Sequence, residues 1–230
     1  MTHASEFFER FLPVSQVLHF LRCDFDFLLN YVVPWQQQIA ANFGVPFVSR
    51  PVEQGDLTYD QKLQLCLPIV YPDMTRIVIS ATQSDWICLW GNGGYGIDGD
   101  AIQRHVGRKF NLERLEIMHI MTRSPGSSQF SYTGPGENGR RRYIAAHKES
   151  RWEFHQFGEP FPFEDQDAYK ERLIKKRLTA ELLDRYCREF GIRLMDEDFY
   201  FGRTVLLPKR GQPQTRVVSE TFGDPDFFAR

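Results

Sequence analysis

Three glycines between Trp90 and Asp98 have the G-x-G-x-x-G spacing that can bind the phosphates of a dinucleotide cofactor: Gly91, Gly93 and Gly96. That chemistry requires a buried parallel strand before the glycines and a long helix that begins at them. Here the preceding strand, "SDWICLW", follows another strand after one short polar turn, which is typical of an antiparallel hairpin. The glycines are therefore predicted to turn the chain, because glycine permits positive φ. No cofactor is expected.

Two aspartates after these glycines, Asp98 and Asp100, begin like a calcium loop. Gln103 and Arg104 occupy the positions of the next ligands, so the pattern does not continue. The aspartates are predicted instead to cap a short helix over residues 98–110, with Gly107 as its stop. Because surface loops carry recognition, Asp98 and Asp100 are also predicted to contribute to binding a partner.

The six histidines lack the H-x-x-x-H and H-E-x-x-H spacings of helical metal sites. Strands would allow His119, His147 and His155 to meet around a metal ion. A hairpin centred on Glu149, however, sets His155 opposite Tyr143 and leaves His147 near the turn. We favour the interpretation that these histidines are partly exposed residues of strands, and no metal ion is expected.

Basic residues cluster at Arg140-Arg141-Arg142 and in "KERLIKKR", residues 170–177. The first cluster opens a strand, so Arg141 should point to the face opposite Arg140 and Arg142. Both clusters fit solvated faces, and Arg140 and Arg142 are predicted to join the partner-binding surface. An alternative is an enzyme that binds a nucleotide or phosphate ester through these arginines and nearby acids. Neither G-x-S-x-G nor a cysteine in a glycine-rich turn occurs, so no catalytic residue is predicted.

The composition describes a packed protein without a strong overall charge. The 230 residues are 42% hydrophobic, and 28 Lys and Arg balance 30 Asp and Glu to a net charge of −2. Nucleic acid is therefore an improbable partner. The N-terminus lacks a basic region followed by an apolar one, and charges interrupt the most apolar stretch, residues 17–33. The four dispersed cysteines fit buried thiols in a reducing compartment. A cytoplasmic protein without membrane association is expected.

The periodicity of apolar residues changes from helical to alternating and back. The fold class that follows is α+β, a mostly antiparallel sheet with N-terminal and C-terminal helices packed on it. One domain is predicted over residues 1–208, followed by a polar tail over 209–230 with Phe227 and Phe228 as an aromatic anchor. Predicted helices cover residues 15–33, 34–44, 98–110 and 163–191. Predicted strands cover residues 62–71, 75–83, 85–92, 112–122, 129–132, 140–147, 151–158 and 196–208.

The clearest hairpin is predicted from "RRRYIAAH" and "RWEFHQFG", with a turn at residues 148–150. Trp152 and Phe154 share one strand face there. They are expected to cover the apolar stripe of the last helix, which contains Leu182, Tyr186 and Phe190. In that helix, Thr179 either caps a second helix or lies inside a continuous one. Trp152→Ala is expected to unfold or severely destabilise the domain.

A pattern over residues 140–200 resembles one found in uncharacterised bacterial proteins associated with immunity partners of secreted toxins. It consists of Trp152-Glu153-Phe154, Gly158 to Glu164, Tyr169, Arg177-Leu178-Thr179, Leu183, Tyr186 and Gly191-Ile192. The resemblance implies a non-enzymatic role, in which the chain binds and neutralises a toxin domain. It carries no catalytic residue to this sequence.

Overall fold

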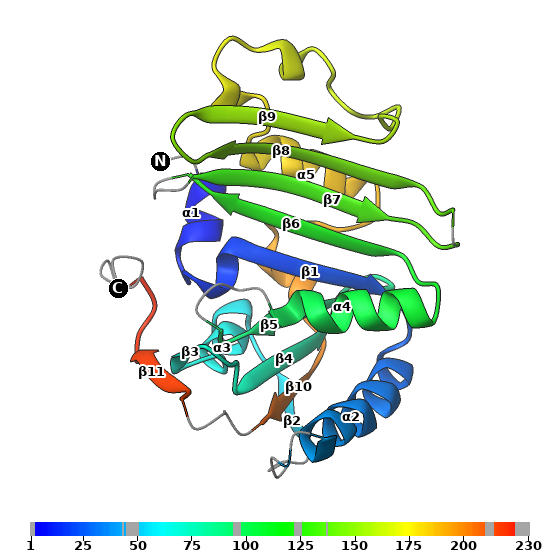
Figure 1. The fold of residues 1–230 in the computed structure, drawn as a ribbon, viewed down its shortest axis with the longest axis vertical. Coiled ribbons are helices and arrows are strands. Elements are labelled where there is room, and N and C mark those ends of the chain that lie inside the picture. Colours follow the sequence, from blue (N-terminus) through cyan, green and yellow to red (C-terminus); the bar gives the residue numbers. More distant parts are fainter. Residues whose placement is uncertain are drawn as a thin grey trace.

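A nine-stranded antiparallel sheet forms the body of the protein, with strand order β2-β10-β4-β5-β1-β6-β7-β8-β9 (Figure 1). The computed structural model describes residues 3–42, 44, 51–93, 98–121, 126–136, 138–209 and 214–223. The strands of the large sheet are β1 (Val17–Arg22), β2 (Val52–Asp56), β4 (Arg76–Ala81), β5 (Trp86–Gly91), β6 (Arg114–Ile120), β7 (Ser127–Thr133), β8 (Arg141–Lys148), β9 (Trp152–Phe157) and β10 (Arg203–Pro208). A second sheet pairs β3 (Ile69–Tyr71) with β11 (Arg216–Ser219).

Helices lie on both faces of the large sheet, so the predicted mixture of helices with an antiparallel sheet is confirmed (Figure 1). The α-helices are α1 (His3–Glu9), α2 (Phe25–Asn42), α3 (Tyr59–Gln64), α4 (Asp98–Lys109) and α5 (Ala180–Arg188). Single 3₁₀ turns are η1 (Val14–Gln16), η2 (Ala168–Lys170), η3 (Ile174–Lys176) and η4 (Glu197–Tyr200). Among the helices of the described residues, none has both the length and the apolar character needed to cross a membrane.

The prediction of a helix over residues 15–33 is wrong for the first half of that segment. Val17–Arg22 forms β1, which lies between β5 and β6 at the centre of the sheet. Only Arg22 of this strand is exposed. A strand buried on both faces is an uninterrupted apolar run, which periodicity does not separate from a buried helix. Helix α2 begins at Phe25 and continues through Pro34, where two helices were predicted.

Two further segments differ from the prediction for local reasons. Residues 62–71 were predicted as a strand, but α3 occupies the first part because Thr58 and Gln61 form a capping box. The predicted helix over 163–191 is an α-helix only in α5, where the Thr179 hydroxyl accepts from the amide of Leu182 as an N-cap. The chain before it forms the 3₁₀ turns η2 and η3.

Other differences are smaller. Gly107 lies inside α4, so it does not end that helix. β7 begins before the short strand that the sequence predicted. Strand β11 lies within the segment predicted as a polar tail and pairs with β3. Phe227 and Phe228 lie outside the described residues.

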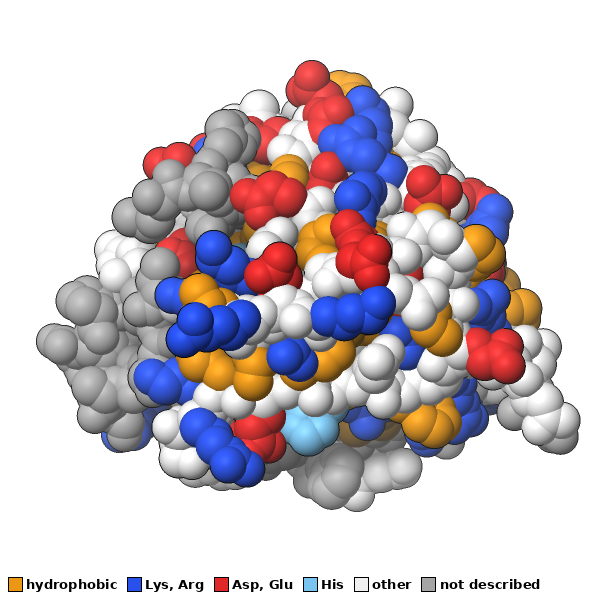
Figure 2. Space-filling model, turned by 90° about the horizontal axis from the view of Figure 1, so that it is seen from above, with side chains coloured by type: hydrophobic (Ala, Val, Ile, Leu, Met, Phe, Trp, Pro, Cys, Tyr) orange, Lys and Arg blue, Asp and Glu red, His pale blue; other side chains and the backbone are white. Residues whose placement is uncertain are grey.

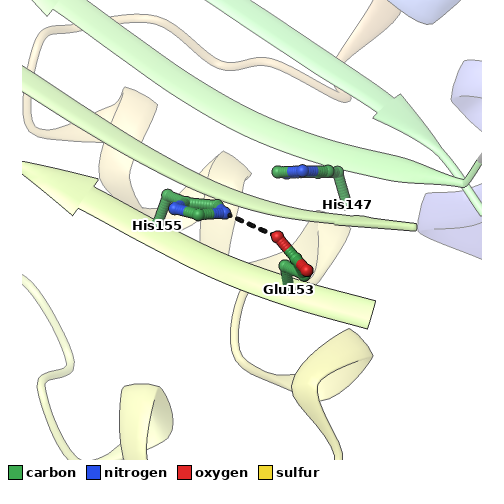
Figure 3. A group of neighbouring side chains, drawn as sticks. All are labelled: His147, Glu153 and His155. Atoms are coloured by element: carbon green, nitrogen blue, oxygen red, sulfur yellow. Dashed lines mark hydrogen bonds and ion pairs between the residues drawn. The ribbon is translucent and has the colours of Figure 1, made fainter. Parts of the chain in front are cut away.

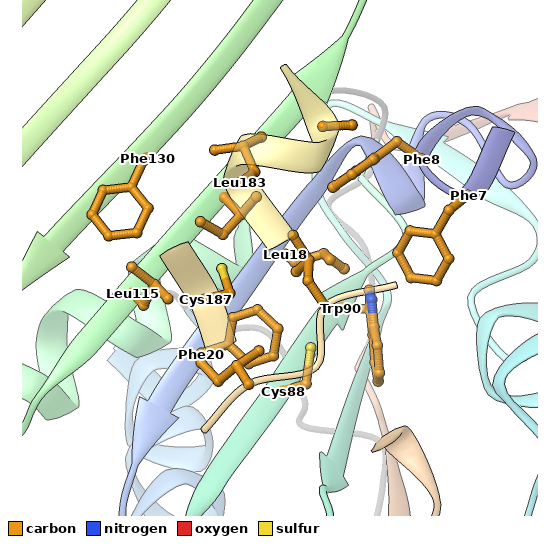
Figure 4. Close-up of a cluster of buried hydrophobic side chains, with 14 of the residues drawn as sticks. Phe7, Phe8, Leu18, Phe20, Cys88, Trp90, Leu115, Phe130, Leu183 and Cys187 are labelled. Carbon is orange, nitrogen blue, oxygen red and sulfur yellow. The ribbon is translucent and has the colours of Figure 1, made fainter. Parts of the chain in front are cut away.

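Two apolar clusters fill the two sides of the sheet. The larger cluster lies between the sheet and α1, α3 and α5, and it includes Phe8, Phe20 and Leu183 (Figure 4). The smaller one lies under α2 and α4 and includes Leu28, Val32 and Ile102. Cys66, Cys88 and Cys187 are buried as predicted, whereas Cys23 is partly exposed.

The aromatic cover of α5 differs from the expectation. Tyr186 packs against Phe130 of β7 and Phe163, with ring centroids 6.0 and 5.8 Å apart. Phe154 packs on Tyr169, with ring centroids 5.3 Å apart and the rings tilted, and Trp152 is only partly buried. The basis for predicting that Trp152→Ala unfolds the protein is therefore absent. The α5 stripe is covered by aromatic residues that come from β7 and from the turn after β9.

The candidate functional site on the open face of the sheet

One face of β7, β8 and β9 carries none of the described helices, whereas α2 and α4 lie on the same side over the other half of the sheet (Figure 1). We call the uncovered side the open face. Alternation along the strands and the pairing register place Gln129, Tyr143, His147, Glu153, His155 and Phe157 on it. The opposite face of the same strands carries Phe130 and Ile144, which belong to the core.

A line of polar side chains crosses four neighbouring strands on this side. Nδ1 of His19 in β1 lies 3.5 Å from Oε2 of Glu116 in β6. Nε2 of Gln129 donates to Oε1 of Glu116 at 2.7 Å, and the Tyr143 hydroxyl donates to Oε1 of Gln129 at 3.3 Å. The line therefore links the covered half of the sheet to the open half.

Glu116 is the charged member of this line. Burial raises the pKa of its carboxyl, but the hydrogen bonds from His19 and Gln129 and the charge of Arg104 outweigh burial and lower that pKa overall. Burial and the negative charge of Glu116 together raise the pKa of Tyr143. At neutral pH the line thus holds an ionised carboxylate beside a neutral phenol.

Three potential metal ligands meet on the open face of the β8–β9 hairpin. His147 lies directly opposite Glu153, and His155 is the next residue of β9 on the same face (Figure 3). The two imidazole rings stack with centroids 5.0 Å apart. Nε2 of His155 lies 3.3 Å from Oε2 of Glu153. One ligand atom from each residue lies within 4.8 Å of the other two.

Glu153 has a further neighbour, because Nε of Arg151 donates to its other oxygen, Oε1, at 3.1 Å. The hydrogen bonds from Arg151 and from His155 lower the pKa of Glu153. The carboxylate is therefore ionised at neutral pH, with Oε2 directed toward the histidines.

The predicted register of this hairpin is wrong. Lys148 pairs with Trp152, so the hairpin is centred on Ser150, and His155 lies opposite Ala145 instead of Tyr143. The corrected register brings His147 and His155 together. His119, the third histidine of the predicted site, lies on the opposite face, where it packs on Phe8 and hydrogen-bonds Ser128. Glu153 takes its place, a residue that sequence reasoning missed although its spacing from His155 signals a shared face.

Arg140 is exposed, as the predicted partner-binding role requires. Its guanidinium lies 3.7 Å from the centroid of the Phe161 ring and donates to the carbonyls of Glu159 and Pro160. It borders an open hollow of about 690 Å³, to which Arg141 and Phe157 also contribute. The hollow lies at the end of β8 and β9, beside the open face.

Arg142 requires a correction, because its side chain is only 1% exposed and cannot meet a partner from inside the fold. It lies on the core side of β8 and forms an ion pair with Glu164. The predicted opposition of Arg141 and Arg142 is confirmed, since Arg141 is exposed. The sequence did not determine which face of β8 the rest of the chain covers.

The glycine-rich segment lies at the end of an antiparallel strand, since β5 pairs antiparallel with both β1 and β4. Gly91 does not have a positive φ, contrary to the reason given for it. A Cβ at this position would overlap the Met74 sulfur, so close packing requires the glycine. Gly93 bridges to Val70, and Gly96 lies outside the described residues.

Two predicted site residues, Asp98 and Asp100, lie in the first turn of α4. Their side chains lie outside the described part of the structure.

Comparison of the chain with protein-family models, with curated proteins and with solved structures finds no match.

Proposed function

We propose that the chain is a non-enzymatic binding protein of the immunity type, and that it neutralises a toxin domain with an acidic surface. The observation that carries the proposal is a set of four cations around β9, which we call the basic rim: Arg141, Arg172, Lys175 and Lys176. Arg141 borders the hollow at the end of β9, and the other three lie in or just before η3, which packs against β9. All four are exposed, and none of them forms an ion pair within the described residues.

The basic rim differs from six other exposed arginines of the described residues, which have carboxylate partners. Each of the six forms an ion pair with an Asp or Glu of the chain: Arg10, Arg22, Arg151, Arg185, Arg188 and Arg203. Unneutralised cations on one surface attract an acidic partner and increase the rate of its association. Figure 2, viewed from the end of the molecule where β9 lies, shows Lys and Arg side chains spread among acidic and apolar ones.

Apolar side chains lie among these cations. Phe157 is 66% exposed at the end of β9, and Leu173 is 49% exposed between Arg172 and η3. An interface needs apolar side chains that lose contact with water on binding, and charges around them that orient the partner. The resemblance of residues 140–200 to proteins associated with toxin immunity supports the same role.

The alternative, an enzyme that acts on a nucleotide or phosphate ester, has weaker support. Arg142 is used inside the protein, and Arg140 donates to two carbonyls of its own chain. Arg141 alone of the three remains for a phosphate at the adjacent hollow.

The experiment is a binding titration against the purified product of each gene adjacent to the gene of this chain. We expect one product to bind, and its toxicity to growing cells to be relieved when the two are co-expressed. The double variant Arg172→Glu with Lys175→Glu should bind at least about tenfold more weakly. The control variant Arg108→Glu with Arg216→Glu changes net charge equally on α4 and β11, and it should bind as the wild type does.

Three outcomes would overturn the proposal. In the first, no adjacent product binds. In the second, the two double variants bind equally well. In the third, duplex DNA or single-stranded RNA binds the basic rim in the same titration and displaces the protein partner, which would assign the surface to nucleic acid.

A further inference from the structure

We propose that His147, Glu153 and His155 form a binding site for a divalent first-row transition metal ion, of which Zn²⁺ is the reference case. The site lies on the open face of the β8–β9 hairpin and is separate from the basic rim. Its three side chains come from adjacent positions of two paired strands, so the backbone already holds them on one side of the sheet.

The chemistry of the ligands selects the class of ion. Imidazole nitrogen suits zinc, copper, nickel and iron, whereas calcium and magnesium take oxygen ligands almost entirely. Two imidazoles and one carboxylate form a donor set found in zinc proteins that leave a fourth position for water or another ligand. His155 is 53% exposed, so the fourth position of this site faces solvent.

The geometry needs only a small adjustment. Zinc–nitrogen and zinc–oxygen bonds of about 2.1 Å place tetrahedral ligands about 3.3 to 3.5 Å apart. The contact between Nε2 of His155 and Oε2 of Glu153 already has this length, at 3.3 Å. All three ligand atoms lie within 4.8 Å of one another, so small rotations of the imidazole rings suffice to bring them to these distances. His155 belongs to the edge strand and is more exposed than His147, so its ring has room to rotate.

Arg151 occupies the remaining oxygen of Glu153 and leaves Oε2 facing His155. A side chain that holds a ligating carboxylate in place acts as the outer partner of a metal site. Its positive charge also repels a cation. Removing Arg151 therefore leaves all three ligands present and takes away this repulsion.

The test is a calorimetric titration of the untagged full chain with Zn²⁺. We expect one ion per chain, with affinity reduced at least about tenfold in His147→Gln and in His155→Gln. Glu153→Gln should also weaken binding, and Arg151→Ala, which keeps all three ligands but frees the carboxylate, should change the affinity less than any of the three ligand variants does. The matched control is His105→Gln, because His105 lies on α4, stacked on Trp35, and so far from the cluster that its loss should leave Zn²⁺ affinity unchanged.

Thermal melts of the variants separate loss of a ligand from loss of the fold. Because His155 is exposed and neither His147 nor Glu153 is fully buried, wild-type melting is expected. The proposal fails if Zn²⁺ shows no saturable binding below about 0.1 mM. It fails equally if the variant with both His147→Gln and His155→Gln binds one Zn²⁺ per chain as tightly as the wild type. Performing the titrations in a Cys23→Ser background excludes binding through the one partly exposed thiol.

Discussion

Arg142 of β8 and Glu164 of the turn after β9 form an ion pair inside the protein, with Nη2 and Oε2 2.6 Å apart and side chains 1% and 0% exposed. Arg142 also donates to the carbonyls of Phe157 and Gly158. The Glu164 carboxylate accepts from the amide of Phe161 and from the hydroxyl of Tyr169, each at 2.9 Å. The pair therefore attaches the chain after β9, which leads to η3, to β8, the strand next to the edge of the sheet.

Removing one charge of this pair leaves the other buried without a partner. We expect Glu164→Ala to reduce the free energy of unfolding by about 3 to 5 kcal/mol, measured by urea denaturation. Asp167→Ala is the matched control, because Asp167 pairs with Lys170 at the surface of the same segment. It should cost less than about 1 kcal/mol. Equal costs for the two variants would show that the buried pair has no special role.

Gly158 follows β9 with a φ of 82°, and a Cβ there would overlap the carbonyl oxygen of Arg141. Because that atom is backbone, the neighbour cannot rotate away. Gly158→Ala should therefore destabilise the protein by several kcal/mol, about 3 or more. Gly191 has a φ of 75° with open space around it, so Gly191→Ala should cost only about 1 to 2 kcal/mol. The comparison is made from the melting temperatures of the two variants, and a larger loss for Gly191→Ala would contradict the structure.

The burial of His119 predicts that the folded protein becomes less stable in acid. Burial lowers the pKa of His119 from 6.5 to about 4. The unfolded chain therefore binds a proton between these values that the folded chain does not, so stability falls as pH falls from 6.5 toward 4. The contribution should be about 2 kcal/mol at about pH 5. From pH 7 to pH 5, the wild type should lose this amount of unfolding free energy relative to the variant His119→Gln. A difference between the two proteins that stays constant with pH would mean that His119 is in contact with water.

The burial of Lys62 predicts that the folded protein becomes more stable as the pH rises into the basic range. The Lys62 ammonium is fully buried and donates to Oγ of Ser80 at 2.8 Å and to the carbonyl of Gly202 at 3.0 Å. Burial lowers the pKa of Lys62 from 10.5 to about 8, so the unfolded chain binds the additional proton between these values. The contribution of Lys62 to stability should rise by about 3 kcal/mol across this range.

The measurement for Lys62 compares the wild type with Lys62→Met at several pH values. The comparison cancels the effects of other groups that ionise in base, including the buried Tyr59 and Tyr200, whose pKa values burial raises. The unfolding free energy of the wild type should increase relative to the variant from pH 8 to pH 10.5. A decrease over this range would mean that the folded protein holds Lys62 charged.

Local signals predicted α4 and the strands of the β4–β5 and β8–β9 hairpins, although not the register of β8 with β9, because short polar turns and helix-start signals act within a few positions. β1 was missed because nothing within residues 17–22 distinguishes a central strand from a buried helix; its partners lie at residues 86–89 and 114–118. The long helix over 163–191 was overpredicted for a related reason. In its first part, Tyr169 packs on Phe154 and donates a hydrogen bond to Glu164. These contacts accompany a 3₁₀ turn in place of the predicted α-helix.

The candidate metal site shows the same division. Alternation along β9 places Glu153 and His155 on one face from the sequence alone. Only the pairing register brings His147 opposite Glu153, and the register depends on whether Lys148 and Trp152 join the ladder. Arg142 is a similar case, since alternation separates it from Arg141 but does not tell which side the rest of the chain will cover.

The strand order has a consequence for the protein as it is synthesised. β1 is made first among the strands but must pair with β5 and β6, and β10, near the end of the described chain, inserts between β2 and β4. The half of the sheet that ends at β2 can therefore not be completed until the last strand of the sheet, β10, has been released. The half from β6 to β9 forms a continuous run of hairpins and can assemble while it emerges. β4 can pair with β5 on one side, but its other side and the whole of β2 must wait for β10, which ends at residue 208.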